Sequence, residues 1–184
     1  MTWAAVVLAG GGAARLDGAD KSALEYDGRS LLEHALAAVA GATETVVVGA
    51  PVPTSRPVTF TRGDPADGGP LAGLCAGVAA LARPPALVVV TAVDMPHLRV
   101  GTVDRLVAAV AGHDAAWLVD EDGCRVLALV VGTRHVTAIA DPHGLPMRAL
   151  ARGLDVHDVP AEGDEARDVD TWADVARLRG GPRT

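Results

Sequence analysis

The chain has 184 residues, of which 49% are hydrophobic and 21% charged, enough to bury a sizeable core in one domain spanning 1–184. Its formal net charge of −7 argues against a nucleic-acid partner, because such proteins usually present a basic face. Cys75 and Cys124 lie far apart without a C-x-x-C pair, which indicates neither a disulfide framework nor a zinc site.

The sequence also contains no signal for a membrane. No basic stretch precedes the first apolar run, and no apolar run approaches the roughly 18 residues of a membrane span. We therefore expect a soluble, cytoplasmic protein. The oligomeric state stays open, with a monomer favoured.

In chain order, the first half alternates apolar strands with helical spacings. Ser30 is a plausible N-cap, and Glu33 three residues later completes a capping box. Pro70 stands where a first helical turn tolerates a missing N–H. We predict strands at Trp3–Ala9, Glu44–Val48, Pro57–Thr61 and Ala86–Ala92, with helices over Leu31–Val39, Leu71–Ala82 and Thr102–Ala111.

The second half is less regular. The turn from Asp120 to Gly123 favours an antiparallel hairpin between two strands, and 161–167 has the composition of a mobile polar loop. We predict strands at Ala115–Val119 and Val126–Val131, an edge strand at Asp155–Val159, and helices over Pro146–Ala151 and Thr171–Leu178.

Alternating strands and helices with apolar strands predict an α/β fold, a three-layer α/β/α sandwich around a mostly parallel, Rossmann-like sheet. Ligands of such sheets bind at the carboxyl ends of the strands. Three polar clusters fall at such ends: the loop after Ala9, the loop 64–69, and Asp94.

The loop after the first strand has the features of a phosphate-binding site. Three consecutive glycines, Gly10 to Gly12, let backbone N–H groups approach an anion, and Arg15 and Lys21 follow closely. A dinucleotide fingerprint requires a third glycine where Arg15 stands. A P-loop requires a glycine immediately before Lys21, where Asp20 stands. Neither common phosphate motif fits.

The signature Leu8-Ala-Gly-Gly-x-x-x-Arg15-Leu-x-Gly18-x-Asp20-Lys21-x-x-Leu24 instead resembles nucleotidyltransferases of the molybdenum cofactor guanylyltransferase type, which have the nucleotide-diphospho-sugar-transferase fold. Three later segments resemble further motifs of that family in the right order. They are Gly69-Pro-Leu-Ala-Gly-Leu74, Ala92-Val-Asp94-Met-Pro96, and Asp168-Val-Asp170-Thr171, the last in place of the family's Asn-x-Asn-Thr.

The resemblance implies transfer of GMP from GTP to the terminal phosphate of molybdopterin, with release of pyrophosphate. It implies Arg15, Lys21 and Asp94 as catalytic residues and Mg²⁺ as cofactor, bound by Asp94 and, less directly, by Asp170. Implied nucleotide contacts come from Leu8, Ala9, Gly10, Gly11, Gly12, Arg15, Lys21, Gly49, Asp64 and Asp94.

Physical chemistry makes these roles intelligible. A phosphate acceptor supplies its own oxyanion, since its second pKa is about 6, so no general base is needed. Mg²⁺ is commonly held by one or two carboxylates together with phosphate oxygens and water. Simpler interpretations remain: Asp94 as a helix N-cap, Asp170 as the cap of the last helix, and Asp64 as a turn residue.

Departures from the family pattern keep alternatives open. Gly49 stands where relatives often carry an asparagine that holds the nucleoside, and Asp168 and Asp170 replace the asparagines. The chain could therefore transfer CMP or another nucleotide to a related phosphorylated acceptor. It could also be a non-catalytic nucleotide- or cofactor-binding protein of the same fold.

Overall fold

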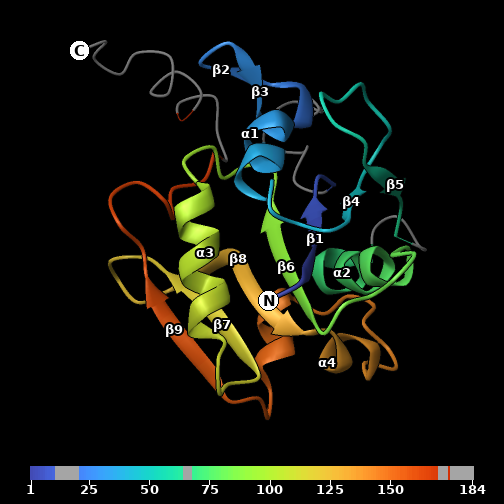
Figure 1. The fold of residues 1–184 in the computed structure, drawn as a ribbon, viewed down its shortest axis with the longest axis vertical. Coiled ribbons are helices and arrows are strands. Elements are labelled where there is room, and N and C mark those ends of the chain that lie inside the picture. Colours follow the sequence, from blue (N-terminus) through green and yellow to red (C-terminus); the bar gives the residue numbers. More distant parts are fainter. Residues whose placement is uncertain (11–20, 64–67, 170–173, 175–184) are drawn as a thin grey trace.

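The computed structural model describes residues 1–10, 21–63, 68–169 and 174. Figure 1 shows a central sheet with helices on both sides. Seven strands form it, in the order β5-β4-β1-β6-β8-β7-β9. They are β1 (Trp3–Leu8), β4 (Thr45–Val48), β5 (Thr59–Thr61), β6 (Leu87–Ala92), β7 (Ala115–Val119), β8 (Arg125–Gly132) and β9 (Val156–Pro160).

The helices are α1 (Leu31–Ala38), α2 (Gly69–Ala79), α3 (Val100–Ala109) and α4 (Thr133–Thr137), with 3₁₀ turns η2 (Lys21–Ala23) and η3 (Met147–Ala151). Among the seven strands described, β8 alone runs antiparallel to both neighbours, while the other pairs are parallel. The mostly parallel sheet is therefore confirmed.

Side chains of β1 divide the core between the two faces of the sheet. Trp3, Ala5 and Val7 pack with residues of α1 and α3, whereas Val6 and Leu8 pack with α2 and α4. All six residues of β1 are buried, as expected for a central parallel strand covered on both faces. The three-layer α/β/α arrangement is confirmed.

The predicted capping box at α1 is only half correct. The Ser30 hydroxyl accepts from the Glu33 N–H at 3.2 Å, so Ser30 is the N-cap. The Glu33 carboxylate, however, accepts from the Ser55 N–H at 2.7 Å and from the Ser55 hydroxyl. It therefore ties α1 to the segment before β5 instead of turning back on Ser30.

Helices α2 and α3 each begin two residues earlier than predicted from the sequence. In α2, Gly69 takes φ +85° and Pro70 occupies the first turn. In α3, Arg99 is the extended N-cap, and the Arg99 N–H donates to the Thr102 hydroxyl at 3.3 Å. Thr102 is thus a capping residue inside the helix and not its first residue.

The β7–β8 hairpin and the edge position of β9 are confirmed, whereas the segment around Pro146–Ala151 is a 3₁₀ turn, η3. A small hairpin, β2 (Glu25–Tyr26) with β3 (Arg29–Ser30), was not predicted. Its turn residues Asp27 and Gly28 both have positive φ, 47° and 74°, as a two-residue type I′ turn requires.

The predicted polar loop over 161–167 is confirmed as an irregular segment with turns, but Glu165 within it is buried and bound to α3, which the prediction of a mobile loop did not include. The predicted helix over 171–178 lies outside the described residues except for Asp174. Within the described part of the chain, every helix is too short or too polar to span a membrane.

Candidate nucleotide site

The carboxyl ends of β1, β4 and β6 meet at one edge of the sheet. Leu8 is level with Ala92 and with Val48 in the two parallel pairings. The pairing continues past the strands, since the Val93 N–H donates to the Leu8 carbonyl at 3.0 Å and the Ala9 N–H to the Val48 carbonyl at 2.9 Å. The chain reverses its lateral direction between β1 and β6, so this edge is the switch point where such sheets bind ligands.

Close backbone approach at this edge explains Gly49. A Cβ added at Gly49 would lie 3.0 Å from the Ala9 Cβ, a contact tighter than side chains normally make. The Gly49 N–H donates to the Thr61 carbonyl at 2.8 Å, which places the residue between the ends of β1 and β5. At Gly49, where the sequence lacks the expected asparagine, only backbone is present, and it packs directly beside Ala9.

Glycines also bring α2 close to the same strands. A Cβ at Gly73 would lie 3.4 Å from Leu8 Cδ2, and one at Gly77 would lie 2.5 Å from Val6 Cγ1. The Gly73 end of the helix is thus nearer the carboxyl edge of the sheet. The N-cap, Gly68, provides no side-chain cap, so the N–H groups of the first turn point towards this edge without a side-chain acceptor at the cap.

Asp94 follows β6 at the same edge and is half-buried, between the buried Val93 and Met95. Its carbonyl accepts from the Val169 N–H at 2.9 Å. The segment that resembles the family's last motif therefore lies against Asp94, and Asp170 is the next residue in the chain.

Some predicted site residues cannot be placed from the structure. Gly11, Gly12, Arg15, Asp64 and Asp170 lie outside the described residues. The backbone of Lys21 opens η2, which packs against α1, and its side chain is not described. The structure thus brings together Leu8, Ala9, Gly10, Gly49 and Asp94, and the roles of all these residues stay predictions.

The single carboxylate at this edge fits a divalent metal ion that takes its other ligands from substrate and water. In the described ranges, no group of three or more His, Cys, Asp or Glu side chains could hold a metal ion by itself. One carboxylate at a ligand-binding edge suits Mg²⁺, which takes most of its oxygen ligands from phosphate and water in such sites. Asp94 meets that requirement by position.

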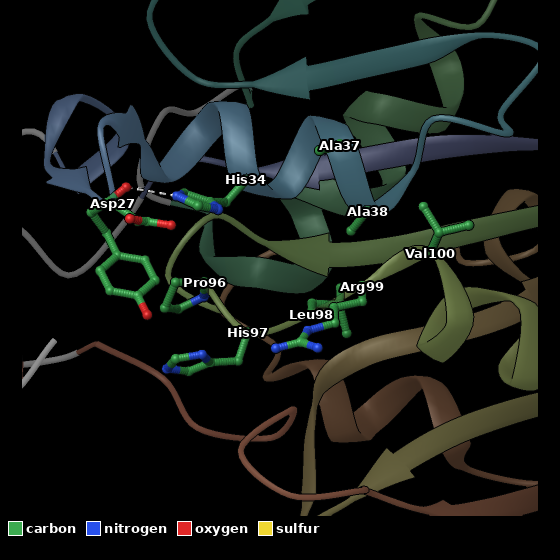
Figure 2. A pocket seen from close by; sticks show the side chains of 10 residues that line it. Asp27, His34, Ala37, Ala38, Pro96, His97, Leu98, Arg99 and Val100 are labelled. Atoms are coloured by element: carbon green, nitrogen blue, oxygen red, sulfur yellow. Dashed lines mark hydrogen bonds between the residues drawn. The ribbon is translucent and has the colours of Figure 1, made fainter. Parts of the chain in front are cut away.

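A cavity of about 330 Å³ lies between α1, the β2–β3 turn and the loop that enters α3 (Figure 2). Its polar lining comes from Tyr26, Asp27, His34, His97 and Arg99. The centre of the Tyr26 ring lies 5.3 Å from that of the His34 ring and 5.6 Å from that of the His97 ring. Burial lowers the pKa of His97 below its ordinary value; the charge of Asp164 opposes this shift, and the positive charges of Arg167 and Arg99 add to it.

A second cavity, of about 400 Å³, opens near Leu87, Asp114 and Gly132. These residues lie at the start of β6, immediately before β7 and at the end of β8, at the edge of the sheet opposite the predicted site. The topology therefore points to the Leu8–Asp94 edge as the ligand site.

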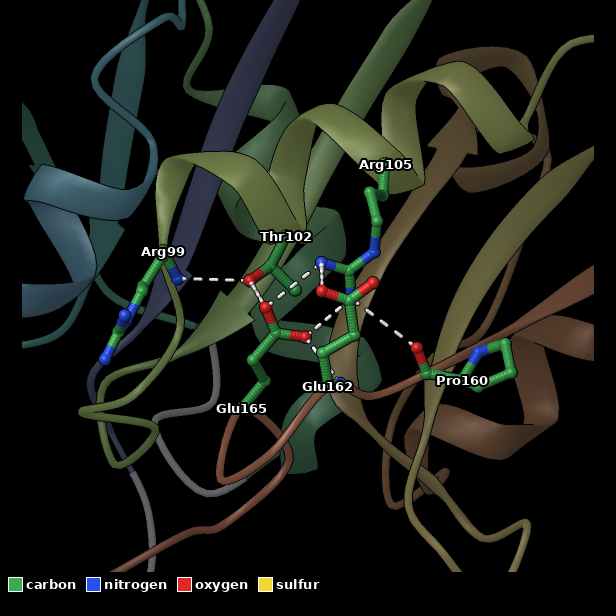
Figure 3. A network of polar contacts seen from close by, with 6 residues as sticks. All are labelled: Arg99, Thr102, Arg105, Pro160, Glu162 and Glu165. Carbon is green, nitrogen blue, oxygen red and sulfur yellow. Dashed lines mark hydrogen bonds and ion pairs between the residues drawn. The ribbon is translucent and has the colours of Figure 1, made fainter.

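Sequence reasoning missed one polar network entirely (Figure 3). Glu165, only 9% exposed, accepts from the Thr102 hydroxyl at 2.5 Å and from Arg105 at 2.6 and 3.1 Å. The two partners lie on α3, and the acidic composition around Glu165 indicates a solvated loop. No local pattern in the sequence identifies this contact.

The strand order, with a glycine-lined switch point and a carboxylate after β6, is that of an α/β protein of the doubly wound class. Residues 5–159 match the family model of the MobA-like NTP transferase domain. The chain belongs to this family.

Curated relatives carry a consistent name. A molybdenum cofactor guanylyltransferase of Mesorhizobium japonicum is 35% identical over 73% of this chain and 64% of its own length. One from Xanthomonas euvesicatoria is 35% identical over 89% of this chain and 85% of its own length. The chain thus spans less than two thirds of the first relative and most of the second.

Solved structures share the fold. Molybdopterin-guanine dinucleotide biosynthesis protein A from Archaeoglobus fulgidus superposes with a TM-score of 0.72 at 20% identity, covering 95% of both chains. Rv0371C from Mycobacterium tuberculosis, solved as a complex with manganese, has a TM-score of 0.72 at 18% identity, covering 99% of this chain and 100% of that one. The nucleotide-diphospho-sugar-transferase fold is confirmed.

Proposed function

We propose that this chain is a guanylyltransferase that transfers GMP from GTP to the terminal phosphate of a molybdopterin-type acceptor and releases pyrophosphate. Membership of the MobA-like family and the names of the curated relatives support this function. The observation that carries it is the meeting of the Leu8–Gly10 backbone, Gly49 and Asp94 at one edge of the sheet. Residues 1–184 would then form one nucleotidyltransferase domain.

In this proposal the backbone from Leu8 to Gly12 binds the nucleotide, with Gly49 and Asp64 beside it. Arg15 and Lys21 bind the phosphates and neutralise charge that grows as the reaction proceeds. An oxygen of the acceptor phosphate forms a bond to the α-phosphorus of GTP. The bond from that phosphorus to the bridging oxygen breaks, and pyrophosphate leaves with the electron pair.

Asp94, with Asp170, would hold Mg²⁺. When bound, the ion would supply Lewis-acid polarisation of the phosphoryl oxygens. Asp94 is half-buried at that edge of the sheet. The hydrogen bond from the Val169 N–H to its carbonyl holds the segment that leads to Asp170 beside it. The manganese complex of the structural neighbour supports the choice of a divalent ion.

The first experiment measures molybdopterin-dependent release of pyrophosphate from Mg-GTP. We expect Asp94→Ala and Lys21→Ala to lower kcat/KM by about 10² to 10³, the usual cost of losing a group that stabilises transition-state charge. Asp104→Ala, on the exposed side of α3, and Arg83→Ala, exposed after α2, make the same charge changes elsewhere and should retain activity. Equal activity of Asp94→Ala and Asp104→Ala would disprove the role of Asp94.

A nucleotide panel tests the substrate. GTP should bind and turn over in preference to CTP and ATP, and preference for CTP would replace the guanylyltransferase assignment by a cytidylyltransferase one. Tight GTP binding without turnover in the presence of Mg²⁺ and acceptor would instead identify a nucleotide-binding protein without catalysis. Titrating Mg²⁺ against Mn²⁺ after treatment with a chelator identifies the ion used.

A further inference from the structure

Two chain segments far apart in sequence form a closed ring beside the predicted metal site. One runs from Asp94 through the loop into the first turn of α3, and the other runs from Pro160 at the end of β9 to Val169. The Val169 N–H bonds to the Asp94 carbonyl at 2.9 Å, and the Thr102 hydroxyl bonds to Glu165 at 2.5 Å. Hydrogen bonds thus join the two segments at two contacts, Val169–Asp94 and Thr102–Glu165.

At the second of these two contacts, both carboxylate oxygens of Glu165 accept hydrogen bonds. One carboxylate oxygen accepts from the Thr102 hydroxyl and from Arg105 Nη1, and the other accepts from Arg105 Nη2 at 2.6 Å and from the Glu162 N–H at 2.9 Å. Figure 3 shows these donors converging on the carboxylate from α3 and from the segment itself. Paired, charge-assisted hydrogen bonds between a guanidinium and a carboxylate are strong, and they also define the relative position of the two groups.

The surroundings keep this carboxylate ionised. Burial alone would raise the pKa of Glu165, but the bonds from Arg105 and Thr102 outweigh it and hold that pKa below its usual range. Removal of the charge would deprive Arg105 of its anionic partner and reduce the number of acceptors for the surrounding donors, which is costly at a largely buried carboxylate.

The Thr102 hydroxyl connects the network to the start of α3. It accepts from the Arg99 N–H at 3.3 Å while it donates to Glu165, so one side chain links the helix cap to the buried carboxylate. Between that cap and Asp94 only a short loop remains, in which Met95, Pro96 and Leu98 are buried. A displacement of the Pro160–Val169 segment would therefore shift Asp94 in two ways: through the Val169–Asp94 hydrogen bond, and through Thr102 and the start of α3.

We infer that Glu165 is a positioning residue, which holds Asp94 and the segment entering Asp170 in the geometry needed to bind a metal–nucleotide complex. This inference rests on the metal role of Asp94 in the proposed function. Glu165 itself does not contact substrate in it; it acts through Thr102 and the Val169–Asp94 bond.

The test is the linkage between Mg²⁺ and GTP, measured by calorimetry as the ratio of GTP dissociation constants without and with the ion. Glu165→Gln and Thr102→Val should each reduce this ratio about tenfold, while GTP affinity without metal stays within about twofold. Thr102→Ser keeps the hydroxyl and should restore the ratio. Glu162→Gln removes an exposed carboxylate that pairs with the same arginine and should leave the ratio unchanged.

Thermal unfolding of each variant separates positioning from stability. If Glu165→Gln lowers the melting temperature but its folded protein keeps the wild-type metal–nucleotide linkage, the inference is overturned. The same holds if Glu162→Gln and Glu165→Gln have equal effects. The linkage between Mg²⁺ and GTP is measured without turnover. An inactive wild-type chain would therefore reject the proposed reaction, while the linkage would still decide the role of Glu165.

Discussion

Replacing Gly77 by alanine tests how closely α2 must approach the sheet. The added Cβ would lie 2.5 Å from Val6 Cγ1 and 3.1 Å from Val48 Cγ2. Val6 is fully buried in the central strand and β-branched, so its side chain cannot rotate away easily. The helix would have to move out by nearly 1 Å to reach ordinary contact at 3.4 Å.

The expected free-energy change combines two opposing effects. Alanine improves helix propensity over glycine by about 1 kcal/mol. Overpacking a rigid core costs about 1–3 kcal/mol, and this site is at the upper end because the clash is with a side chain anchored in a strand. We expect Gly77→Ala to lose about 1–2 kcal/mol of unfolding free energy, a fall in Tm of roughly 2–8 °C for a chain of this size.

Two control variants isolate the clash from the propensity. A Cβ at Gly101, in α3, meets nothing within 4 Å, and one at Gly73 meets only ordinary contacts at 3.4 and 3.6 Å. Gly101→Ala and Gly73→Ala should therefore be neutral or stabilising by up to about 1 kcal/mol. Urea unfolding followed by circular dichroism provides the comparison. The packing argument fails if Gly77→Ala is as stable as Gly101→Ala.

Two further predictions concern ionisable groups. Since burial lowers the pKa of His97, the unfolded chain binds that proton more readily, so stability should fall as pH drops from 7.5 to 5.5, and His97→Gln should show a smaller fall in urea unfolding. NMR titration of the His97 ring checks the direction of the shift. Cys75 is half-buried with a raised pKa, whereas Cys124 is exposed, so a thiol reagent should label Cys124 first, and Cys124→Ser should remove the fast phase; equal rates would contradict the burial argument.

Elements decided by local pattern were predictable from sequence. The apolar run of β1 indicates a strand buried on both faces, Ser30 indicates a helix start, and the turn before Cys124 indicates a hairpin, and all three are confirmed. The placement of the Leu8 end of β1 beside the Ala92 end of β6, which Asp94 follows, was also predictable, because the carboxyl ends of parallel strands share an edge. The Asp27-Gly28 pair is an equally clear hairpin signal in the sequence, and both residues have the positive φ of such a turn.

Features decided by distant partners were not predictable. Glu33 binds Ser55 instead of Ser30, and Glu165 binds Arg105 across sixty residues of sequence. A charged residue has the same local signature whether it is solvated or paired in the core, so only the tertiary structure distinguishes the two cases. The contributions of Arg15 and Asp64 to the site stay predictions, since both lie outside the described residues.

The strand order has a kinetic consequence for the nucleotide site. β7 and β8 are joined by a tight turn and pair locally, whereas β1 pairs with β6 only after a long stretch of chain has been enclosed. The entropy of closing such a loop is lost before any contact repays it, so pairings of this kind form slowly. The junction of Leu8 with Ala92 belongs to the slow pairing. We therefore expect this edge of the sheet, the predicted nucleotide site, to form later in folding than the β7–β8 hairpin.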